Sequence, residues 1–223
     1  MNLFYINTNE IQDKFLDTIN KKYISQKEKQ LLEKYIREKD KKNKLCSIFL
    51  QKYMYHNKFQ IPIENIKFQY NTYGKPAILK GRDNYNYNIS HDHNIVVGIS
   101  DISPIGIDII YIDRKKNFKY LKNCFAKSEW KHINQSTNKD KTFSIYWSLK
   151  EAYLKCIGTG IGKKKLMDYH FDIQNIKKIM LYINGKIIQN IYFKILEKDG
   201  YIIAIALKKY KYFEIKLLSL QKI

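Results

Sequence analysis

The chain has 223 residues, of which 44% are hydrophobic and 14% aromatic, so it should fold around a substantial core rather than remain disordered. Its formal charge of +20, from 41 basic and 21 acidic side chains, favours an anionic partner such as nucleic acid, a membrane surface, phosphates or an acidic protein. A bias toward Lys, Asn, Ile and Tyr is an alternative explanation, because an AT-rich coding sequence produces it without selection for binding.

The cysteines and the N-terminus predict the compartment. Cys46, Cys124 and Cys156 are far apart, which excludes a disulfide framework and a paired metal site. We expect buried thiols in a reducing compartment. The opening MNLFYINTNE lacks the basic start and apolar run of a signal peptide, and no apolar stretch is long enough to span a bilayer. The sequence therefore predicts a soluble, cytoplasmic protein with no membrane partner.

The first hundred residues alternate between strand and helix patterns. In chain order, they predict a strand at 3–7, an amphipathic helix marked by Ile11, Phe15 and Ile19, a charged helix after the N-cap Ser25, a helix from Leu45 to about His56, a strand at 66–70, and strands at 85–90 and 95–100. The segment NTYGKP is a turn, and HDHN is a tight connection between the last two strands.

The rest of the chain repeats this rhythm. After Pro104, we predict a strand at 105–110, helices at 117–134 and 141–157, and strands within 178–183, 186–195, 201–207 and 212–218, with hairpin turns at Asn184-Gly185 and Asp199-Gly200. The order predicts an α+β fold of two pseudo-symmetric halves, 1–103 and 104–223, tightly packed, each with a small antiparallel sheet on helices.

One acidic residue interrupts an apolar strand. In IGIDII, Gly106, Asp108 and Ile110 share one face of the strand. Burying the Asp108 carboxylate without a partner would cost several kcal/mol or raise its pKa, so it needs a cation or hydrogen-bond donors. A structural salt bridge to one of the many lysines is one reading, and a functional site is the other.

A polar stripe runs along the predicted helix at 141–157. Trp147, Glu151 and Lys155 are spaced at i, i+4 and i+8, opposite an apolar face that includes Cys156. Glu151 and Lys155 could form an ordinary surface pair, but a large aromatic side chain on the same stripe favours the wall of a site. The glycines of Gly158-Thr159-Gly160 should cap the helix.

Two turns carry groups that bind phosphate. NISHDHN offers the hydroxyl of Ser90, the ring of His91 and nearby backbone N–H groups as donors. A zinc site or a Ser-His nucleophile is poorly supported by this spacing. Lys75 in GKP presents an ammonium group from a rigid turn, and an ordinary solvated surface lysine is the alternative.

Four segments occur in an order that is similar to one family. They are GKP at 74–76, NISH at 88–91, GID at 106–108, and W-x-x-KEA-x-x-K-x-x-G-x-G from Trp147 to Gly160. Together they resemble the 4′-phosphopantetheinyl transferases of the surfactin-synthetase-activating type. The resemblance runs from about Ile24 to Gly162, and beyond it only the β-rich pattern agrees.

The resemblance implies two α+β halves with coenzyme A bound in the cleft between them, where the active site lies. Such enzymes, which include holo-[acyl-carrier-protein] synthases, move the phosphopantetheine arm of coenzyme A to a serine hydroxyl of an apo carrier protein. The other product is 3′,5′-adenosine bisphosphate. The usual metal is Mg²⁺, with Mn²⁺ as an alternative.

The resemblance also implies roles for individual residues. Asp108 and Glu151 would hold the metal, Glu151 would also accept the serine proton, and Lys155 would stabilise the pyrophosphate or the departing phosphate. Trp147 would pack beside the site and fix the helix. The predicted coenzyme A contacts are Lys44, Lys75, Pro76, Ser90, His91, Lys150 and Lys155, and other basic residues between Lys27 and Lys44 are weaker candidates.

One position departs from the family pattern. Many relatives read Gly-Ile-Asp-Ile-Glu, with the glutamate as a further metal ligand, whereas this chain has Ile110, which cannot coordinate a metal. We predict that Asp92, directly after Ser90-His91, replaces it. A degenerate relative that binds coenzyme A or a carrier without turnover is the alternative that Ile110 supports.

The basic charge suits an acidic carrier protein or carrier domain and polyanionic coenzyme A. The carrier's pathway, whether fatty-acid, polyketide, peptide-synthetase or amino-adipate, stays open. We expect a monomer that does not act on nucleic acid. A basic nucleic-acid-binding protein is the rival from another class, but it leaves the four ordered segments unexplained.

Overall fold

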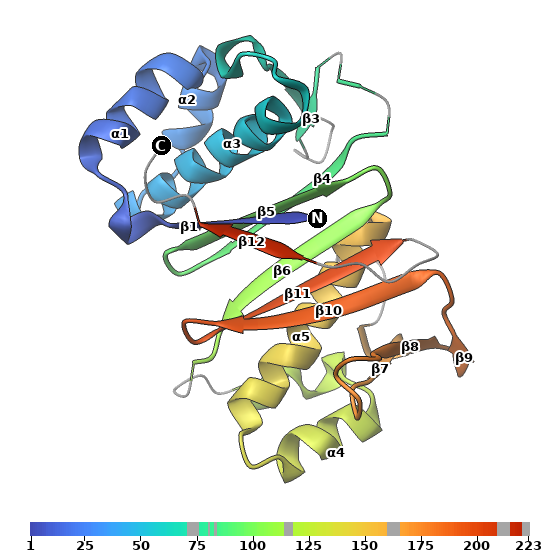
Figure 1. Cartoon of the computed structure of the whole chain (residues 1–223). Helices are drawn as coiled ribbons and strands as arrows, with labels where there is room; N and C mark the ends of the chain where they lie inside the picture. The colour runs from blue at the N-terminus through green and yellow to red at the C-terminus, as the bar shows by residue number, and fades with distance from the viewer. Residues whose placement is uncertain are drawn as a thin grey trace. The chain divides into compact units, whose positions relative to one another are not determined.

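The computed structural model of the chain describes residues 1–70, 76–79, 81–82, 84–113, 118–159, 166–208 and 215–219. The chain divides into two compact units. The first contains Met1–Ile102 and the segment that begins at Ile215, and the second is Ser103–Glu214 (Figure 1). Each unit combines helices with small, mainly antiparallel sheets, so the predicted α+β fold class is confirmed.

The first unit contains a four-stranded sheet. Its strands are β1 (Asn2–Asn7), β4 (Asn86–Asp92), β5 (Ile95–Asp101) and β12 (Lys216–Ser219), in the order β12-β1-β5-β4. β1 and β4 are antiparallel to β5, whereas β12 is parallel to β1. The helices are α1 (Asp13–Thr18), α2 (Gln26–Leu32) and α3 (Glu38–Phe59), with helical turns η1 (Thr8–Glu10), η2 (Ile19–Tyr23) and η3 (Ile63–Asn65); β2 (Phe68–Tyr70) pairs with β3 (Pro76–Ile78).

Helix α3 packs against the sheet of the first unit through residues spaced about one helical turn apart. The cluster joins Cys46, Leu50 and Met54 to Phe4, Ile6 and Val96. The helix before it, α2, begins at the predicted cap: the backbone N–H of Ser25 donates to Oε2 of Glu28 at 2.7 Å, and the N–H of Glu28 donates to Oγ of Ser25 at 3.4 Å.

The second unit contains two three-stranded sheets. β6 (Ile105–Tyr111), β10 (Ile191–Lys198) and β11 (Tyr201–Lys208) form one in the order β10-β11-β6, and β7 (Tyr169–Asp172), β8 (Met180–Ile183) and β9 (Lys186–Ile187) form the other. All their pairs are antiparallel. The helices are α4 (Lys127–Gln135) and α5 (Lys139–Ile157), with helical turns η4 (Lys119–Cys124) and η5 (Leu166–Asp168).

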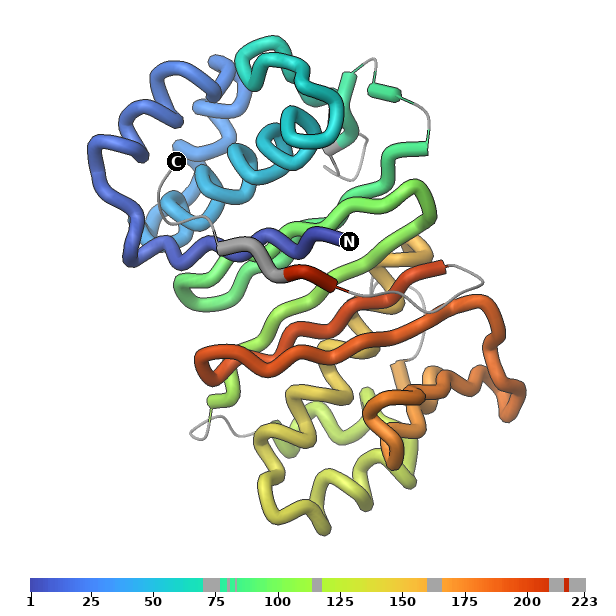
Figure 2. Tube along the Cα trace, in the orientation of Figure 1, coloured from blue at the N-terminus to red at the C-terminus, as the bar shows by residue number. Residues whose placement is uncertain are grey.

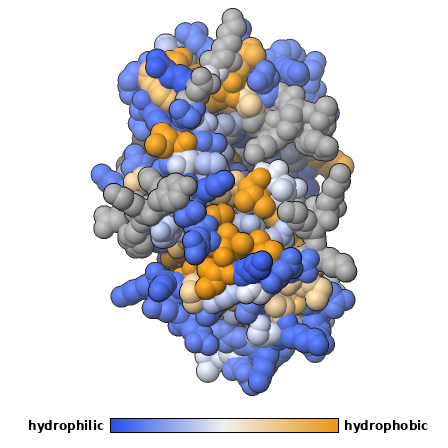
Figure 3. Space-filling view, turned by 90° about the vertical axis from the view of Figure 1, so that its right-hand side faces the viewer, coloured by the Kyte–Doolittle hydropathy of each residue, from blue (hydrophilic) through white to orange (hydrophobic). Residues whose placement is uncertain are grey.

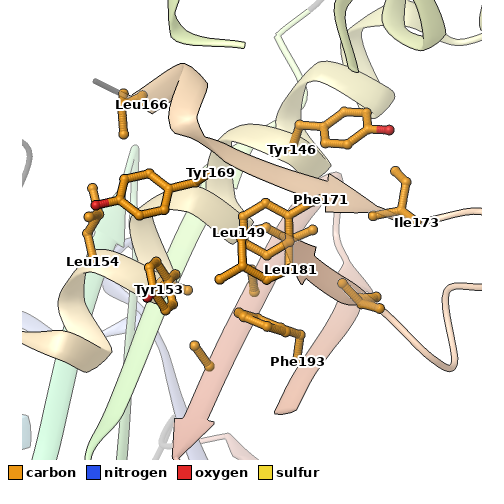
Figure 4. Close-up of a cluster of buried hydrophobic side chains, with 14 of the residues drawn as sticks. Tyr146, Leu149, Tyr153, Leu154, Leu166, Tyr169, Phe171, Ile173, Leu181 and Phe193 are labelled. Atoms are coloured by element: carbon orange, nitrogen blue, oxygen red, sulfur yellow. The ribbon is translucent and has the colours of Figure 1, made fainter. Parts of the chain in front are cut away.

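Helix α5 supplies much of the core of the second unit. Figure 4 shows its side chains Tyr146, Leu149 and Tyr153 among residues from β7, β8 and β10. The small buried side chains Ala204 and Ala206 on β11 belong to the same cluster. Short side chains on the strand allow α5 to approach the sheet closely.

The hairpin turns form as predicted. Asn184 and Gly185 have φ angles of 51° and 74°, and Asp199 and Gly200 have φ angles of 51° and 79°. Positive φ at both central residues is what a tight hairpin with right-handed strand twist requires, and Asn-Gly and Asp-Gly accept it at low cost.

Three local predictions are corrected. The single helix expected at 117–134 is instead η4 followed by α4, because the buried Phe125 is in an extended conformation between them. β4 continues to Asp92, so Ser90 to Asp92 lie on a strand and only the two residues after them turn. β7 was missed, since it lacks a long alternating pattern.

The two compact units divide between residues 102 and 103, one residue before the predicted boundary, and the segment that begins at Ile215 belongs to the first unit, whereas we assigned all of 104–223 to the second half. Figure 2 shows the C-terminal segment beside the N-terminal strand, and Asn2 is in register with Lys216. An apolar edge strand such as β1 leaves backbone groups unpaired, and β12 covers them. The cleft between the halves stays a prediction.

Candidate active site

The second unit brings together three of the predicted site residues. Asp108 lies in the middle of β6 and is 7% exposed, and its Oδ1 accepts a hydrogen bond from Nζ of Lys155 on α5 at 2.7 Å. Strand and helix meet here because Gly106, two residues earlier, lies against the backbone of α5: a Cβ at Gly106 would overlap the carbonyl oxygen of Ala152. The salt bridge that Asp108 requires is therefore made by another site residue.

Glu151 lies one helical turn before Lys155, close enough to Asp108 for the two carboxylates to interact. Burial raises the pKa of Glu151, the negative charge of Asp108 raises it further, and the positive charge of Lys155 lowers it. Two acidic side chains and one ammonium group thus share a half-buried environment. Such a cluster binds a cation or takes up a proton more readily than isolated surface carboxylates do.

One member of this cluster, Lys155, reaches solvent near the end of α5. The helix ends at Gly158, whose φ of 74° is the left-handed conformation typical of a helix C-cap, as predicted. The Lys155 side chain is 28% exposed, so its ammonium group can reach a bound anion while it contacts Asp108. Gly160 lies outside the described residues.

Trp147 packs among aromatic rings at the other end of the stripe. Its ring stacks on Phe143 with 6.0 Å between centroids and lies 6.3 Å from the ring of Phe125. These contacts explain why a large aromatic residue occupies the partly exposed side of α5. These contacts hold the helix in place. Trp147 therefore packs against the core of the second unit, and its ring contacts are not with Asp108.

The structure corrects the role predicted for Lys150. We predicted contact with coenzyme A, but its side chain is fully buried and its Nζ forms an ion pair with Oε2 of Glu129 at 2.8 Å. The same Nζ donates to the carbonyl oxygens of Leu166 and Tyr169. With these partners and no exposure, it cannot reach a ligand, so Lys150 is a residue of the core.

The first unit contains the second group of predicted residues. Lys44 on α3 and His91 on β4 line one cavity of 220 Å³, together with Ser47, Gln51, Tyr87, Asn88 and Ile89. Burial lowers the pKa of Lys44. A half-buried ammonium group beside an imidazole ring, a hydroxyl and amides is suited to an anionic or nucleotide-like ligand.

Gln51 is a polar residue of this cavity that was not predicted from the sequence. It is 6% exposed, and within the part of the chain that the structure describes its Oε1 has no hydrogen-bond partner. Lys44, Ser47 and Gln51 are spaced at i, i+3 and i+7, which places them on one face of α3. With Lys44 predicted as a ligand contact, this helical spacing could have identified Ser47 and Gln51 as its neighbours.

Ser90 and Asp92 do not join Lys44 in this cavity. Ser90 is buried at 7% exposure, because neighbours on a strand point to opposite faces. Asp92 lines a cavity of 320 Å³ with Arg37, Lys39, Asp40, Asn43, His91 and His93. Its Oδ1 accepts the backbone N–H of His93 at 3.0 Å. His91 is the residue that the two cavities share.

Several predictions lie beyond these observations. Lys75 is outside the described residues, and for Pro76 only the backbone, at the start of β3, is described. Among the described residues, no group of three or more His, Cys, Asp or Glu side chains is arranged to hold a metal ion. Among the described helices, none has both the length and the apolar character that a bilayer span requires.

The sequence matches two family descriptions that follow each other along the chain. Residues 11–103 match the N-terminal domain of 4′-phosphopantetheinyl transferases, and residues 104–206 match the 4′-phosphopantetheinyl transferase superfamily. The junction between the two matches lies one residue after the division between the structural units.

Individual relatives agree with these families. The L-aminoadipate-semialdehyde dehydrogenase-phosphopantetheinyl transferase of Mus musculus is 30% identical over 155 residues, which cover 62% of this chain and 50% of the mouse protein. The 4′-phosphopantetheinyl transferase gsp of Aneurinibacillus migulanus is 31% identical over 141 residues, covering 62% and 57%. The chain thus spans about half the length of these relatives.

Among solved structures, a holo-(acyl-carrier-protein) synthase from Bacillus anthracis in complex with coenzyme A is 24% identical, with a TM-score of 0.40. The similarity covers 48% of this chain and 96% of that one. Because this score is low, the fold assignment rests on the strand order and helix packing described above.

Proposed function

We propose that this chain, whose residues 11–103 and 104–206 match two consecutive 4′-phosphopantetheinyl transferase families, transfers the phosphopantetheine arm of coenzyme A to a serine hydroxyl of an apo carrier protein. The products are the holo-carrier and 3′,5′-adenosine bisphosphate. The observation that carries this proposal is the cluster in the second unit, in which Asp108, Glu151 and Lys155 combine two carboxylates with one partly exposed ammonium group.

The donor set of this cluster fits a hard divalent cation. Asp108 and Glu151 would hold Mg²⁺, or Mn²⁺ as an alternative, through carboxylate oxygens, the ligands that such ions prefer. When bound, the ion offsets the negative charge of the diphosphate. Burial first, and then the negative charge of Asp108, raise the pKa of Glu151, and a cation held between the two carboxylates would offset that charge. Asp92 is our candidate for the ligand that Ile110 cannot provide.

The protein side chains divide the remaining chemistry between them. The serine oxygen attacks the phosphorus attached to pantetheine, and the bond from that phosphorus to the oxygen of the adenosine bisphosphate breaks. Glu151 accepts the serine proton, directly or through a water molecule, and a pKa raised above its usual value makes it a better base. Lys155 is placed to stabilise the negative charge on the departing phosphate.

We assign the adenosine end of coenzyme A to the first unit. Lys44 and His91 would contact the 3′-phosphate, and the unpartnered Oε1 of Gln51 would accept a hydrogen bond from the adenine amino group. Lys75 remains a candidate for the same phosphate.

The protein partner that we propose is an acidic carrier protein or domain. Figure 3 shows hydrophilic side chains around a group of hydrophobic ones on one face, and the whole chain carries a formal charge of +20. A basic surface speeds the encounter with an acidic partner and adds little to the reaction itself. We propose action in the cytoplasm as a monomer, and the choice among carrier pathways awaits the assay below.

The test is a transfer assay with the purified protein, Mg²⁺, coenzyme A and a panel of apo carriers, read by mass spectrometry for the phosphopantetheine adduct. Glu151→Gln should reduce the rate by at least about 100-fold, because it removes both a proton acceptor and a ligand. The variant should be at least as thermally stable as the wild type, since a half-buried carboxylate beside Asp108 is replaced by a neutral amide.

The control is Glu197→Gln, which neutralises a carboxylate in the same unit that is 49% exposed and paired with Lys141. This variant should keep the wild-type rate. Binding of coenzyme A by the wild-type protein without transfer to any carrier would instead indicate a degenerate relative. Transfer that survives Glu151→Gln would refute the role of Glu151.

A further inference from the structure

A buried ion pair lies one residue from the proposed catalytic base. Lys150 directly precedes Glu151, and neither Lys150 nor its partner Glu129 is exposed to solvent. The ammonium group lies 5.6 Å from the ring centroid of Phe125 and 5.9 Å from that of Phe171. Neither charge reaches solvent, so the pair has no direct role in binding a ligand.

Glu129 also accepts two backbone hydrogen bonds. Its Oε2 accepts the backbone N–H of Ala126 at the start of α4, and its Oε1 accepts the N–H of Phe171 on β7, each at 2.8 Å. Lys150 donates further hydrogen bonds to the carbonyl oxygens of Leu166 in η5 and of Tyr169 at the start of β7. One ion pair therefore fastens the middle of α5 to α4 and to the start of β7.

Another side of α5 is fixed by close packing. Gly106 on β6 lies so close to the backbone that a Cβ would overlap the carbonyl oxygen of Ala152 and the amide nitrogen of Cys156. Residues 150 and 152 flank Glu151 in the sequence, and each is held from its own side of the helix. The rotation of α5 about its axis, which sets where Glu151 and Lys155 point, is thus fixed by both contacts.

The first unit contains a similar buried ion pair that is not next to a proposed catalytic residue. Lys52 on α3 pairs with Glu28 at 2.9 Å and donates to the carbonyl oxygen of Tyr23 at 2.7 Å, and Glu28 likewise caps the helix on which it lies. The residue after Lys52 is Tyr53, an aromatic side chain. The pair in the first unit is therefore a natural control for the pair in the second.

We propose that Glu129 and Lys150 are positioning residues for the transfer reaction, holding α5 so that Glu151 and Lys155 face Asp108. This inference rests on the proposed function. In it, Lys150 orients the catalytic base Glu151 and does not contact coenzyme A. Small displacements of a catalytic group are costly, because about 1 Å of misplacement can reduce a rate about 100-fold.

The first experiment separates positioning from stability. Lys150→Met leaves Glu129 buried without its partner and should lower Tm by roughly 10 °C, with a kcat per folded molecule reduced about 10- to 100-fold and a KM for coenzyme A changed by less than about threefold. The double variant Glu129→Gln/Lys150→Met removes the uncompensated charge and should recover part of the lost Tm. It should remain slow, because the ties to Leu166 and Tyr169 are still absent.

Lys52→Met is the matched control in the first unit. It should lower Tm by a similar amount and keep kcat per folded molecule within about twofold of the wild type. If kcat of the double variant recovers along with its Tm, or if Lys52→Met lowers kcat as much as Lys150→Met does, the pair in the second unit is merely structural and the proposal is overturned.

A second measurement does not depend on activity. In a crystal structure of the double variant, the distance between Nζ of Lys155 and Oδ1 of Asp108, 2.7 Å in the wild-type chain, should exceed that of a hydrogen bond. Persistence of the 2.7 Å contact would overturn the proposal. If the wild-type protein transfers nothing from coenzyme A, the proposed function fails, and this distance still decides whether the ion pair orients α5.

Discussion

Burial disfavours the charged form of two side chains to which we assign a function. It raises the pKa of Glu151, an acid, and lowers that of Lys44, a base, because in both cases the charged form loses hydration. Residues that are kept charged at a cost in stability are typical of sites that bind an opposite charge. Each of these costs should disappear when the side chain is neutralised.

At Lys44 this cost should depend on pH. The folded-state pKa of Lys44 is below its ordinary value of 10.5, so below the folded-state pKa the group is charged in both states and the full cost of its burial is present. The cost declines as pH rises toward 10.5, where the unfolded chain also loses the proton. Lys44→Met should therefore have a higher Tm than the wild type at pH 7, and the difference should shrink at alkaline pH.

The measurement is the Tm of both proteins by circular dichroism between pH 7 and pH 10, with the exposed Lys39→Met as the control. The same Lys44→Met protein should bind coenzyme A at least about tenfold more weakly, because a charge-assisted contact with phosphate is lost. A constant difference in Tm across this range would contradict the burial argument, and unchanged affinity would contradict the assignment of Lys44 to the ligand.

At the scale of single elements, the contact between β6 and α5 decides where the acidic cluster forms. Asp108 and Lys155 come from different elements, and they meet because the strand and the helix approach each other at a glycine. The pattern of IGIDII places Gly106 and Asp108 on one strand face, and the stripe on α5 places Glu151 and Lys155 on one helix face. Which strand face meets which helix face is a property of the packing.

Gly106→Ala should disturb this contact directly. Its Cβ would overlap backbone atoms of α5, which cannot rotate away as a side chain can, so we expect a loss of about 3 kcal/mol or more in the free energy of unfolding. The control is Gly158→Ala: a Cβ there meets no atom within 4 Å, and the φ of 74° is the only source of strain. That control should cost about 1 kcal/mol.

Urea unfolding of both variants provides the comparison. An equal loss for the two glycines would mean that α5 and β6 are not packed as closely as described. A folded Gly106→Ala protein should also transfer phosphopantetheine more slowly, since the helix that carries Glu151 is displaced.

At the scale of the whole molecule, the chain does not divide into two consecutive halves. β12 follows the second unit in sequence and pairs with β1 of the first, so the C-terminal segment completes a sheet that the N-terminal residues begin. The stability of the first unit should therefore depend on residues at both ends of the chain.

A single backbone hydrogen bond tests this arrangement. The N–H of Lys216 donates to the carbonyl oxygen of Met1 at 2.8 Å. Lys216→Pro removes that donor and should lower the free energy of unfolding by about 1–3 kcal/mol, with faster amide hydrogen exchange in β1. Lys216→Ala keeps the N–H and should behave like the wild type. Equal exchange in β1 for the two variants would show that β12 does not pair there.

The sequence by itself determined the α+β class, the hairpin turns, the cap at Ser25, and the two faces that carry Asp108 and Glu151. These features follow from rules that act within a few residues, such as side-chain periodicity and the tolerance of Asn-Gly for positive φ.

Only the tertiary structure decided which lysine pairs with which acid. The sequence placed Lys150 and Lys155 in the same motif, yet the first is buried against Glu129 and the second contacts Asp108 at the edge of the cluster. The tertiary structure likewise decided that Ser90 is buried and that β12 pairs with β1. Ion pairs and strand neighbours depend on distances between segments that are remote in the chain, and those distances exist only once the core has packed.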